Sequence, residues 1–132
     1  MADAYKFELV SPERLLVSEA IDQVVIPGTE GEMTVMANHA PVMTTLKPGV
    51  VKVRTTAGKD DRYVVFGGFA DILPDGCTVL AESAVHVDDV NRDELTRRIQ
   101  EAREDVADAK TDEARRVANE NLEHLKDLQR SL

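Results

Sequence analysis

Apolar and charged residues alternate along several short segments in the first two thirds of the chain. The alternation is clear at residues 5–9, 32–35 and 51–54, so each segment, as a strand, would present one face to a core. No helical period of useful length separates such segments, which argues against alternating strand and helix units. Turn-forming residues interrupt the region at short intervals, and the pattern predicts about eight to ten short strands in an all-β sandwich or barrel. These turns lie at residues 27–28, 47–49, 57–59, 67–68 and 74–76.

A helical period replaces this alternation after residue 90. Apolar residues recur every three or four positions across residues 95–109 and again across residues 114–132, which predicts two amphipathic helices. We expect Asn91 to cap the first helix and Thr111 or Asp112 to cap the second. The tight connection between the two helices predicts an antiparallel hairpin.

The expected hairpin has alanines near its turn and large apolar residues at its open end. There Leu95 and Ile99 would meet Leu125 and Leu128. A two-helix unit of about 45 residues encloses no core and is marginally stable alone. We therefore expect it to dock on a surface or to change position when a partner binds. A hairpin packed permanently on the β domain is the other interpretation.

Composition divides the chain near the same point. All 7 glycines, all 5 prolines and every aromatic residue lie at or before residue 76. Residues 87–132 instead carry 22 charged side chains among 46 residues, a density typical of solvent-exposed helix. The sequence therefore predicts a β-sandwich domain at residues 1–86 and a helical hairpin at residues 87–132.

Charge and apolar content exclude several classes of protein. The 16 Lys and Arg against 25 Asp and Glu give a formal net charge of −9, so nucleic acid, whose binding draws on clustered cations, is not an expected partner. No apolar stretch approaches the roughly 20 residues that cross a bilayer, and no charged leader precedes one. We expect neither direct membrane insertion nor processing. Cys77 is the only cysteine, which leaves no internal disulfide.

The sequence contains few candidate catalytic, metal-binding or phosphate-binding residues. His39, His86 and His124 lie dozens of residues apart, so no two of them can form a local metal-binding motif. The sequence has neither a nucleophile elbow nor a phosphate-binding loop. We interpret the paired acids Asp60-Asp61 and Asp88-Asp89 as solvated turn residues. We therefore expect no catalytic residue, no metal and no cofactor.

Two segments give a more specific indication of function than these isolated residues. Residues 26–50 contain Gly-Thr-Glu-Gly-Glu and His-Ala-Pro, and Gly67-Gly68-Phe69 precedes Val-Leu-Ala-Glu-Ser-Ala at residues 79–84. Both segments resemble the signature stretches of the epsilon subunits of F-type ATP synthases, which are equivalent to the mitochondrial delta subunits. The resemblance covers essentially the whole chain, and a β domain followed by a charged helical hairpin agrees with the family layout.

The resemblance implies a ten-stranded β-sandwich with a C-terminal helix pair in the central stalk, or rotor, of a proton-translocating ATP synthase. In this family the sandwich binds the gamma subunit and sits on the ring of c subunits, and the subunit itself catalyses nothing. The implied location is peripheral, on the cytoplasmic face of the bacterial inner membrane or on the equivalent organellar membrane.

The resemblance also implies two sets of interface residues. Along the Gly-x-x-Gly-Glu motif, the residues that would meet the polar loops of the c-ring are Glu30, Gly31 and Glu32. Those toward the gamma subunit would be His39, Ala40 and Pro41. A turn that offers two carboxylates suits a basic or polar partner. Solvated turn residues and a bend capped by histidine are the alternative interpretations.

The family's regulatory features are altered here. Some members bind ATP through an Ile/Leu-Asp-x-x-Arg-Ala motif at the start of the first helix, where this chain has Asn91, Glu94 and Leu95 in place of the acid, the arginine and the alanine. A carboxylate in place of a cation repels phosphate, so we expect no useful nucleotide site.

In many bacterial members the hairpin extends along the gamma subunit and blocks ATP hydrolysis, with a basic second helix against the catalytic head of alpha and beta subunits. From Asp112 onward this chain has four bases against five acids, so we expect weak regulation at most. An independent β-sandwich adaptor that recruits a protein through its hairpin is the alternative from another class, and an enzyme is the third and weakest.

Overall fold

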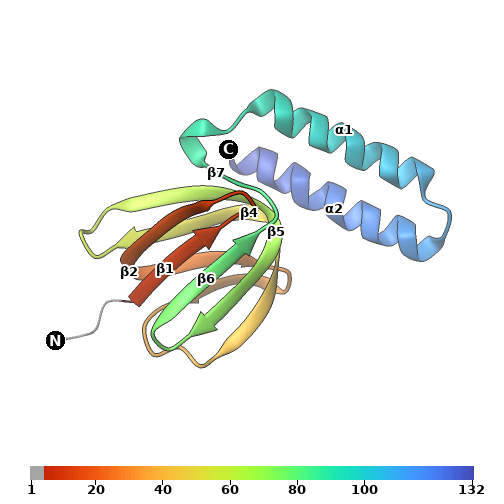
Figure 1. Cartoon of the computed structure of the whole chain (residues 1–132). Helices are drawn as coiled ribbons and strands as arrows, with labels where there is room; N and C mark the ends of the chain where they lie inside the picture. The colour runs from red at the N-terminus through yellow and green to blue at the C-terminus, as the bar shows by residue number, and fades with distance from the viewer. Residues whose placement is uncertain (1–4) are drawn as a thin grey trace. The chain divides into compact units, whose positions relative to one another are not determined.

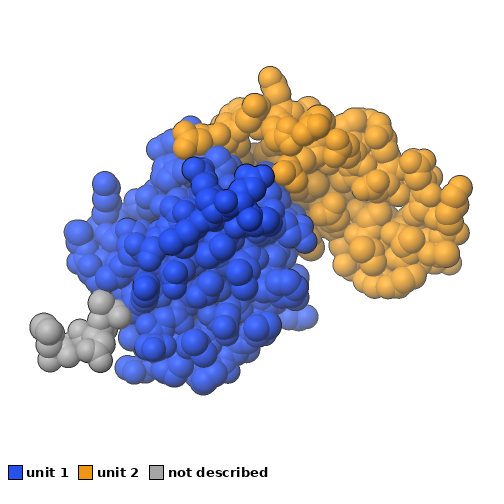
Figure 2. Space-filling view, in the orientation of Figure 1, with its two compact units in different colours: residues 1–88 blue, residues 89–132 orange. Residues whose placement is uncertain are grey.

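The computed structural model describes residues 5–132, and the chain divides into two compact units, residues 1–88 and 89–132 (Figure 2). The division falls two residues after the expected boundary at residue 86. The extra residues belong to a short 3-10 turn, η1 (Val87–Asp89), whose Asp88 N–H donates to Nδ1 of His86 at 3.1 Å. This hydrogen bond ties the start of the turn to the strands.

The described part of the first unit contains seven strands (Figure 1). They are β1 (Tyr5–Val10), β2 (Leu15–Gly28), β3 (Gly31–Val35), β4 (Val42–Thr55), β5 (Asp60–Leu73), β6 (Gly76–Ala81) and β7 (Ala84–His86). The hydrogen-bonded order is β1-β6-β5-β4-β2-β3, with β7 on β5 and a further pairing of β1 with β2. Since β1 pairs with both β6 and β2, the sheet closes on itself into a barrel-like sandwich.

The expected counts, about eight to ten strands from the sequence pattern and ten from the resemblance, are both too high for the described residues, because three strands are much longer than expected. Each of β2, β4 and β5 has 14 residues. Pro48 lies inside β4 and Gly67-Gly68 inside β5, yet the two strands stay in one antiparallel register from Val42 opposite Ile72 to Arg54 opposite Asp60. Here the proline and the glycines bend a continuous pair of strands, although proline and glycine often mark the end of a strand.

The core forms where alternating apolar residues point inward. In β1 the side chains of Tyr5, Phe7 and Leu9 are at most 2% exposed, and Tyr5 Oη donates to the carbonyl oxygens of Leu73 at 2.7 Å and Gly76 at 3.0 Å. The buried phenol is therefore satisfied by the turn between β5 and β6. The other large members of the core include Ile21, Val24, Ile26, Val35, Val51, Val53, Val65, Ile72 and Val79.

The second unit contains two helices, α1 (Arg92–Asp108) and α2 (Asp112–Ser131). Both predicted caps are confirmed: Asn91 Oδ1 accepts from the Glu94 N–H at 3.1 Å, and Thr111 Oγ1 accepts from the Ala114 N–H at 3.0 Å. These side chains satisfy amides that the first turn of a helix leaves unpaired.

Burial in the helical unit is concentrated toward its open end. The buried residues are Leu95, Ile99 and Ala102 of α1 and Leu122, Leu125 and Leu128 of α2. Near the turn between the helices, Val117 is 52% exposed. The last turn of α1 contains no basic residue, but the guanidinium of Arg115 in α2 donates to the Ala109 carbonyl oxygen at the C-cap of α1 at 3.4 Å, which places a cation at the negative end of the helix dipole.

A first prediction concerns the bend in β5. Gly68 and Gly31 share a φ of +133°, but a Cβ at Gly68 would lie 2.1 Å from the Leu80 carbonyl oxygen, whereas nothing lies within 4 Å of one at Gly31. The backbone conformation alone should cost about 1–2 kcal/mol in either alanine variant. The clash should raise the loss in Gly68→Ala to about 4 kcal/mol, or abolish folding.

Urea denaturation of the parent, Gly68→Ala and Gly31→Ala gives the two free-energy differences directly. Equal losses would mean that β6 can move away from β5 at little cost, contrary to the close approach described above.

Candidate functional site

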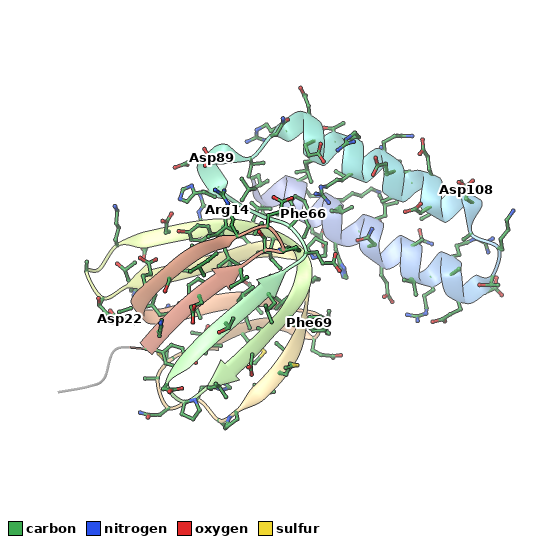
Figure 3. All side chains as sticks on the ribbon, in the orientation of Figure 1. Arg14, Asp22, Phe66, Phe69, Asp89 and Asp108 are labelled. Atoms are coloured by element: carbon green, nitrogen blue, oxygen red, sulfur yellow. The ribbon has the colours of Figure 1, made fainter. Side chains whose placement is uncertain are left out.

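An exposed row of apolar side chains crosses the outer side of the sheet. Phe69 of β5 lies opposite Leu80 of β6, Leu80 lies beside Val10 of β1, and Val10 pairs with Leu15 of β2. Phe69 is 50% exposed, Leu80 47% and Leu15 53%. Phe69 is labelled on the outer side of β5 in Figure 3.

Two further apolar residues extend this row on the same side of the strands. Met43 of β4 lies opposite Asp71 and is 65% exposed, and Leu73 of β5 is 43% exposed. We call the five side chains Leu15, Met43, Phe69, Leu73 and Leu80 the apolar face. A contiguous exposed patch of this kind marks an interaction surface more often than isolated exposed residues do.

The acidic turn between β2 and β3 lies next to the apolar face. Thr29 donates its N–H to the Thr45 carbonyl oxygen at 3.0 Å, and the two hydroxyls are 2.9 Å apart. Thr45 in turn lies opposite Phe69. Glu30 is exposed, and Glu32 forms an exposed ion pair with Lys52 at 3.8 Å. The carboxylates of this turn therefore remain accessible to a partner.

The segment with His39 borders another part of the apolar face. Asn38 has a positive φ of 68°, and its N–H donates to the Pro74 carbonyl oxygen at 2.8 Å, next to Leu73. His39 is half-buried, and its Nδ1 donates to the Ala40 carbonyl oxygen at 2.8 Å, whereas Ala40 and Pro41 are exposed. The two sets of expected interface residues thus adjoin one surface, which sequence reasoning did not identify.

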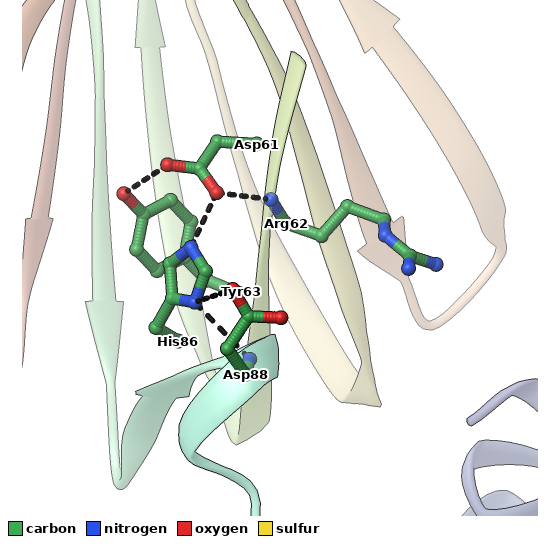
Figure 4. Close-up of polar contacts among 5 residues, drawn as sticks. All are labelled: Asp61, Arg62, Tyr63, His86 and Asp88. Carbon is green, nitrogen blue, oxygen red and sulfur yellow. Dashed lines mark hydrogen bonds and ion pairs between the residues drawn. The ribbon is translucent and has the colours of Figure 1, made fainter.

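A second polar cluster joins β5, β7 and η1 (Figure 4). Asp61 Oδ1 accepts from the Arg62 N–H at 3.1 Å and contacts Nε2 of His86, and Tyr63 Oη donates to Asp61 Oδ2 at 3.2 Å. The rings of Tyr63 and His86 meet edge to face, with centroids 5.2 Å apart. The pairing of Tyr63 with His86 across β5 and β7 brings these residues together.

This cluster shifts the titration of two of its members. Burial works against ionisation of Asp61, but hydrogen bonds from His86, the Arg62 N–H and Tyr63 hold its pKa below the ordinary value. Burial and the nearby Asp61 carboxylate raise the pKa of Tyr63 to about 12. The turn-like sequence context of Asp61 predicted a solvated charge, and no local pattern reveals its contact with His86, which lies 25 residues away.

The three altered positions of the nucleotide motif have structural roles. Asn91 caps α1, and Leu95 is only 2% exposed. Glu94 forms an ion pair with Arg97 at 2.5 Å and a longer one with Arg98 at 3.6 Å. The helix start therefore presents a carboxylate where phosphate recognition would require a cation.

Residues 5–132 contain neither a cluster of metal-ligating side chains nor a helix suited to cross a membrane. No group of three or more His, Cys, Asp or Glu side chains there is arranged to hold a metal ion. Neither α1 nor α2 combines the length and the apolar content needed to cross a membrane.

Comparison with known proteins links the sandwich to one family. Residues 4–87 match the family model described as ATP synthase, Delta/Epsilon chain, beta-sandwich domain. The ATP synthase epsilon chain of Mesorhizobium japonicum is 70% identical over 129 residues, covering 98% of this chain and 96% of the relative. The epsilon chain of Rhizobium etli (strain CIAT 652) is 69% identical over 109 residues, covering 83% and 81%.

Solved structures show the same architecture. A chain in the Euglena gracilis mitochondrial ATP synthase, determined as an OSCP/F1/c-ring assembly, matches with a TM-score of 0.77 and 26% identity, covering 99% of this chain and 82% of that one. A chain in the central stalk/c-ring structure of the Tetrahymena thermophila mitochondrial ATP synthase has a TM-score of 0.69 over 95% of this chain and 96% of that one. At 14% identity, the second match shows a common fold only.

The Asp61 cluster yields a prediction about acid stability. Since the pKa of Asp61 is lowered in the folded chain, its charged form stabilises the fold fully above the unfolded value, roughly pH 4, and this stabilisation is lost as the pH falls through the lowered pKa. Asp61→Asn, which cannot ionise, should be less stable than the parent by about 1 kcal/mol at neutral pH. Urea denaturation at decreasing pH should show the difference shrinking below roughly pH 4.

Asp60→Asn is the matched control. Asp60 pairs with Arg54 at 3.1 Å on the exposed surface, so its loss should change the free energy of unfolding by less than about 0.5 kcal/mol. Coincident pH profiles for the two variants would mean that the hydrogen bonds to Asp61 do not stabilise the folded chain.

Proposed function

The chain belongs to the family of ATP synthase delta/epsilon chains, and we propose that it acts as a non-catalytic subunit of the central stalk, or rotor, of a proton-translocating F-type ATP synthase. In this role the sandwich couples the gamma subunit and the c-ring to the catalytic head. The 70% identity to an ATP synthase epsilon chain over nearly the full length supports the assignment. The structural observation that carries it is the exposed apolar face next to the acidic turn.

The apolar face fits the gamma subunit. It lies on paired strands of a closed sheet, so little conformational freedom is lost when a partner covers it. Phe69 is its only aromatic member, and aromatic side chains often dominate the energy of an interface. His39, Ala40 and Pro41 adjoin the same surface through the hydrogen bond between Asn38 and Pro74, and we assign them to the rim of this contact.

The acidic turn fits the polar loops of the c-ring. Glu30, Gly31 and Glu32 lie at a tight turn that β2 and β3 hold from both sides. The ion pair between Glu32 and Lys52 is exposed and 3.8 Å long, so exchanging it for a partner's cation costs little. Carboxylates of this kind adjust orientation and association more than they anchor a complex.

For the helical unit we propose at most weak regulation of ATP hydrolysis, through contact with the alpha and beta subunits. Ion pairs within α2 already engage its basic residues: Arg116 with Glu113 at 2.6 Å and Glu120 at 2.7 Å, and Arg130 with Asp127 at 2.5 Å. Basic residues that are already paired in this way attract acidic segments of another subunit less strongly. We further propose that the helix start binds no nucleotide, because Glu94 replaces the cation of the family motif.

The proposed location follows from the proposed assembly. A subunit held by gamma and the c-ring would be peripheral, on the cytoplasmic face of the bacterial inner membrane or on the equivalent organellar membrane. The alternative of an independent adaptor predicts that the chain does not form a stable complex with gamma, so the binding experiment below separates the two.

A prediction tests the apolar face. Phe69→Asp should weaken binding to the gamma subunit of the same ATP synthase by about 30-fold or more, because it places a charge at the centre of the expected contact. Isothermal titration calorimetry or co-purification of the two subunits measures the effect. His39→Ala should reduce affinity less, by about two- to fivefold, as expected for a residue at the rim.

Val117→Asp is the matched control, since Val117 is 52% exposed and Phe69 50%, but Val117 lies in α2. It should bind gamma within about twofold of the parent. Unchanged affinity in Phe69→Asp would contradict docking through the apolar face, and no affinity of the parent for gamma would favour the independent adaptor.

A further prediction tests the acidic turn. Glu32→Lys should leave gamma binding intact but lower ATP synthesis by membrane vesicles reconstituted with the variant complex, by about two- to fivefold, because it reverses a charge facing the c-ring. Glu32→Gln, which removes the charge without reversing it, should have an intermediate effect.

Glu13→Lys provides the same charge reversal in the exposed loop between β1 and β2. It should support ATP synthesis at the parent rate. If Glu32→Lys and Glu13→Lys behave alike, the acidic turn does not take part in coupling to the c-ring.

A further inference from the structure

The last strand of the first unit ends at a histidine, two residues before the division between the units. His86 is the last residue of β7, and the chain passes through η1 before it reaches the helices. The division between the two units falls between Asp88 and Asp89. One hydrogen bond of the His86 ring, from the Asp88 N–H, therefore reaches the backbone that leads to the helical unit.

The observed hydrogen bonds define the protonation state of this ring. The Asp88 N–H donates to Nδ1 of His86 at 3.1 Å, so Nδ1 carries no proton. In a neutral imidazole the proton then lies on Nε2, which faces Asp61 Oδ1 and donates to it. Both ring nitrogens are thus satisfied by neutral histidine, one by β5 and the other by η1.

Protonation is incompatible with one of these two hydrogen bonds. A proton on Nδ1 turns that atom into a donor, and it can no longer accept from the Asp88 N–H. The Asp88 carboxylate supplies a new acceptor close by, since its Oδ2 lies 3.6 Å from Nδ1. The hydrogen bond of Nε2 to Asp61 persists in either state. The change is therefore confined to the η1 side of the ring.

The charged groups around the ring belong to two strands, β4 and β5, and to the turn η1. They line an open groove of about 510 Å³ together with Gln23 of β2. Lys52 and Arg54 of β4 are paired with Glu32 and Asp60, and Arg62 of β5 lies in the same groove. Tyr63 of β5 contacts the ring through its edge, and Asp61 and Asp88 are the carboxylates in contact with the ring nitrogens.

We propose that His86 is a pH-sensitive clamp on the connection between the two units. In its neutral form it holds the turn Val87–Asp89 by accepting the Asp88 N–H, and in its protonated form it releases this amide and binds the Asp88 carboxylate. Histidine is the side chain whose charge ordinarily changes between pH 5 and 8. The inference rests on the geometry of the cluster and does not require the proposed rotor function.

The conformational flexibility of the connection between the two units would therefore depend on pH. The 3-10 turn is only three residues long, and short 3-10 segments have weaker hydrogen-bond geometry than α-helices. Without the bond to Nδ1, the backbone of the connection gains conformations that the neutral histidine excludes. Acidification would loosen the attachment of the helical unit without unfolding either unit.

Nuclear magnetic resonance of the full-length, ¹⁵N-labelled chain between pH 8 and pH 5 tests this proposal. We expect the His86 ring nitrogens to report the Nε2–H form at pH 8. The Asp88 amide proton should shift upfield with the same midpoint as His86 protonation, and its protection against hydrogen exchange, corrected for pH, should fall by about fivefold. His124, in α2, serves as the internal reference, and the Asp88 amide should not follow its titration.

Three variants separate the clamp from a general effect of acid. His86→Asn and His86→Gln cannot titrate, so the Asp88 amide should lose its pH dependence in both, and either variant suffices if the other fails to fold. Asp88→Asn keeps the backbone amide and should retain the transition. A stationary Asp88 amide during His86 protonation in the parent, or a transition that persists in the His86 variants, would overturn the proposal.

Discussion

The double pairing of β1 is the constraint on which the rest of the first unit depends. This strand hydrogen-bonds to β6 in parallel and to β2 in antiparallel fashion, and without it the sheet would be open between β6 and β2. Closure leaves neither edge of β1 free for pairing with another chain. It also fixes which side of each strand faces the core. The apolar face exists because Phe69 and Leu80 lie on the side that closure turns toward solvent.

Sequence patterns predicted the elements well where local physics decides them. Alternation located the strands, and Asn91 and Thr111 marked the helix starts, since a capping side chain bonds within three residues of itself. The strand count failed because Pro48 and Gly67 have two local meanings, the end of a strand or a bend within it. Only the long-range register of β4 against β5 selects the second meaning.

The candidate sites were harder to predict from the sequence than the helices and strands, because they depend on which strands pair in the folded chain. Phe69 and Ala70 are adjacent, and apolar character alone favours burial of the larger residue, yet Ala70 is fully buried and Phe69 is half exposed. The register with β6 decides between them. In the same way, Asp61 and His86 meet only because β7 pairs with β5. The turn residues Glu30 and Glu32 came from a family resemblance, and the structure adds their position beside the apolar face.

The two units are stabilised differently, and this difference gives each a separate part in the proposed function. The sandwich encloses a core of buried apolar side chains. The helical unit instead relies on a short apolar seam and on exposed ion pairs between neighbouring helical turns, and each of these ion pairs contributes little to the free energy of folding. A rotor subunit under load needs a rigid, well-packed body at its contacts with gamma and the c-ring. A regulatory appendage needs weaker stabilisation, because its position can change only if the free energies of its alternative positions are close. The cluster at His86 lies where these requirements meet, and a titratable hydrogen bond at that point can alter the attachment while the closed sheet stays intact.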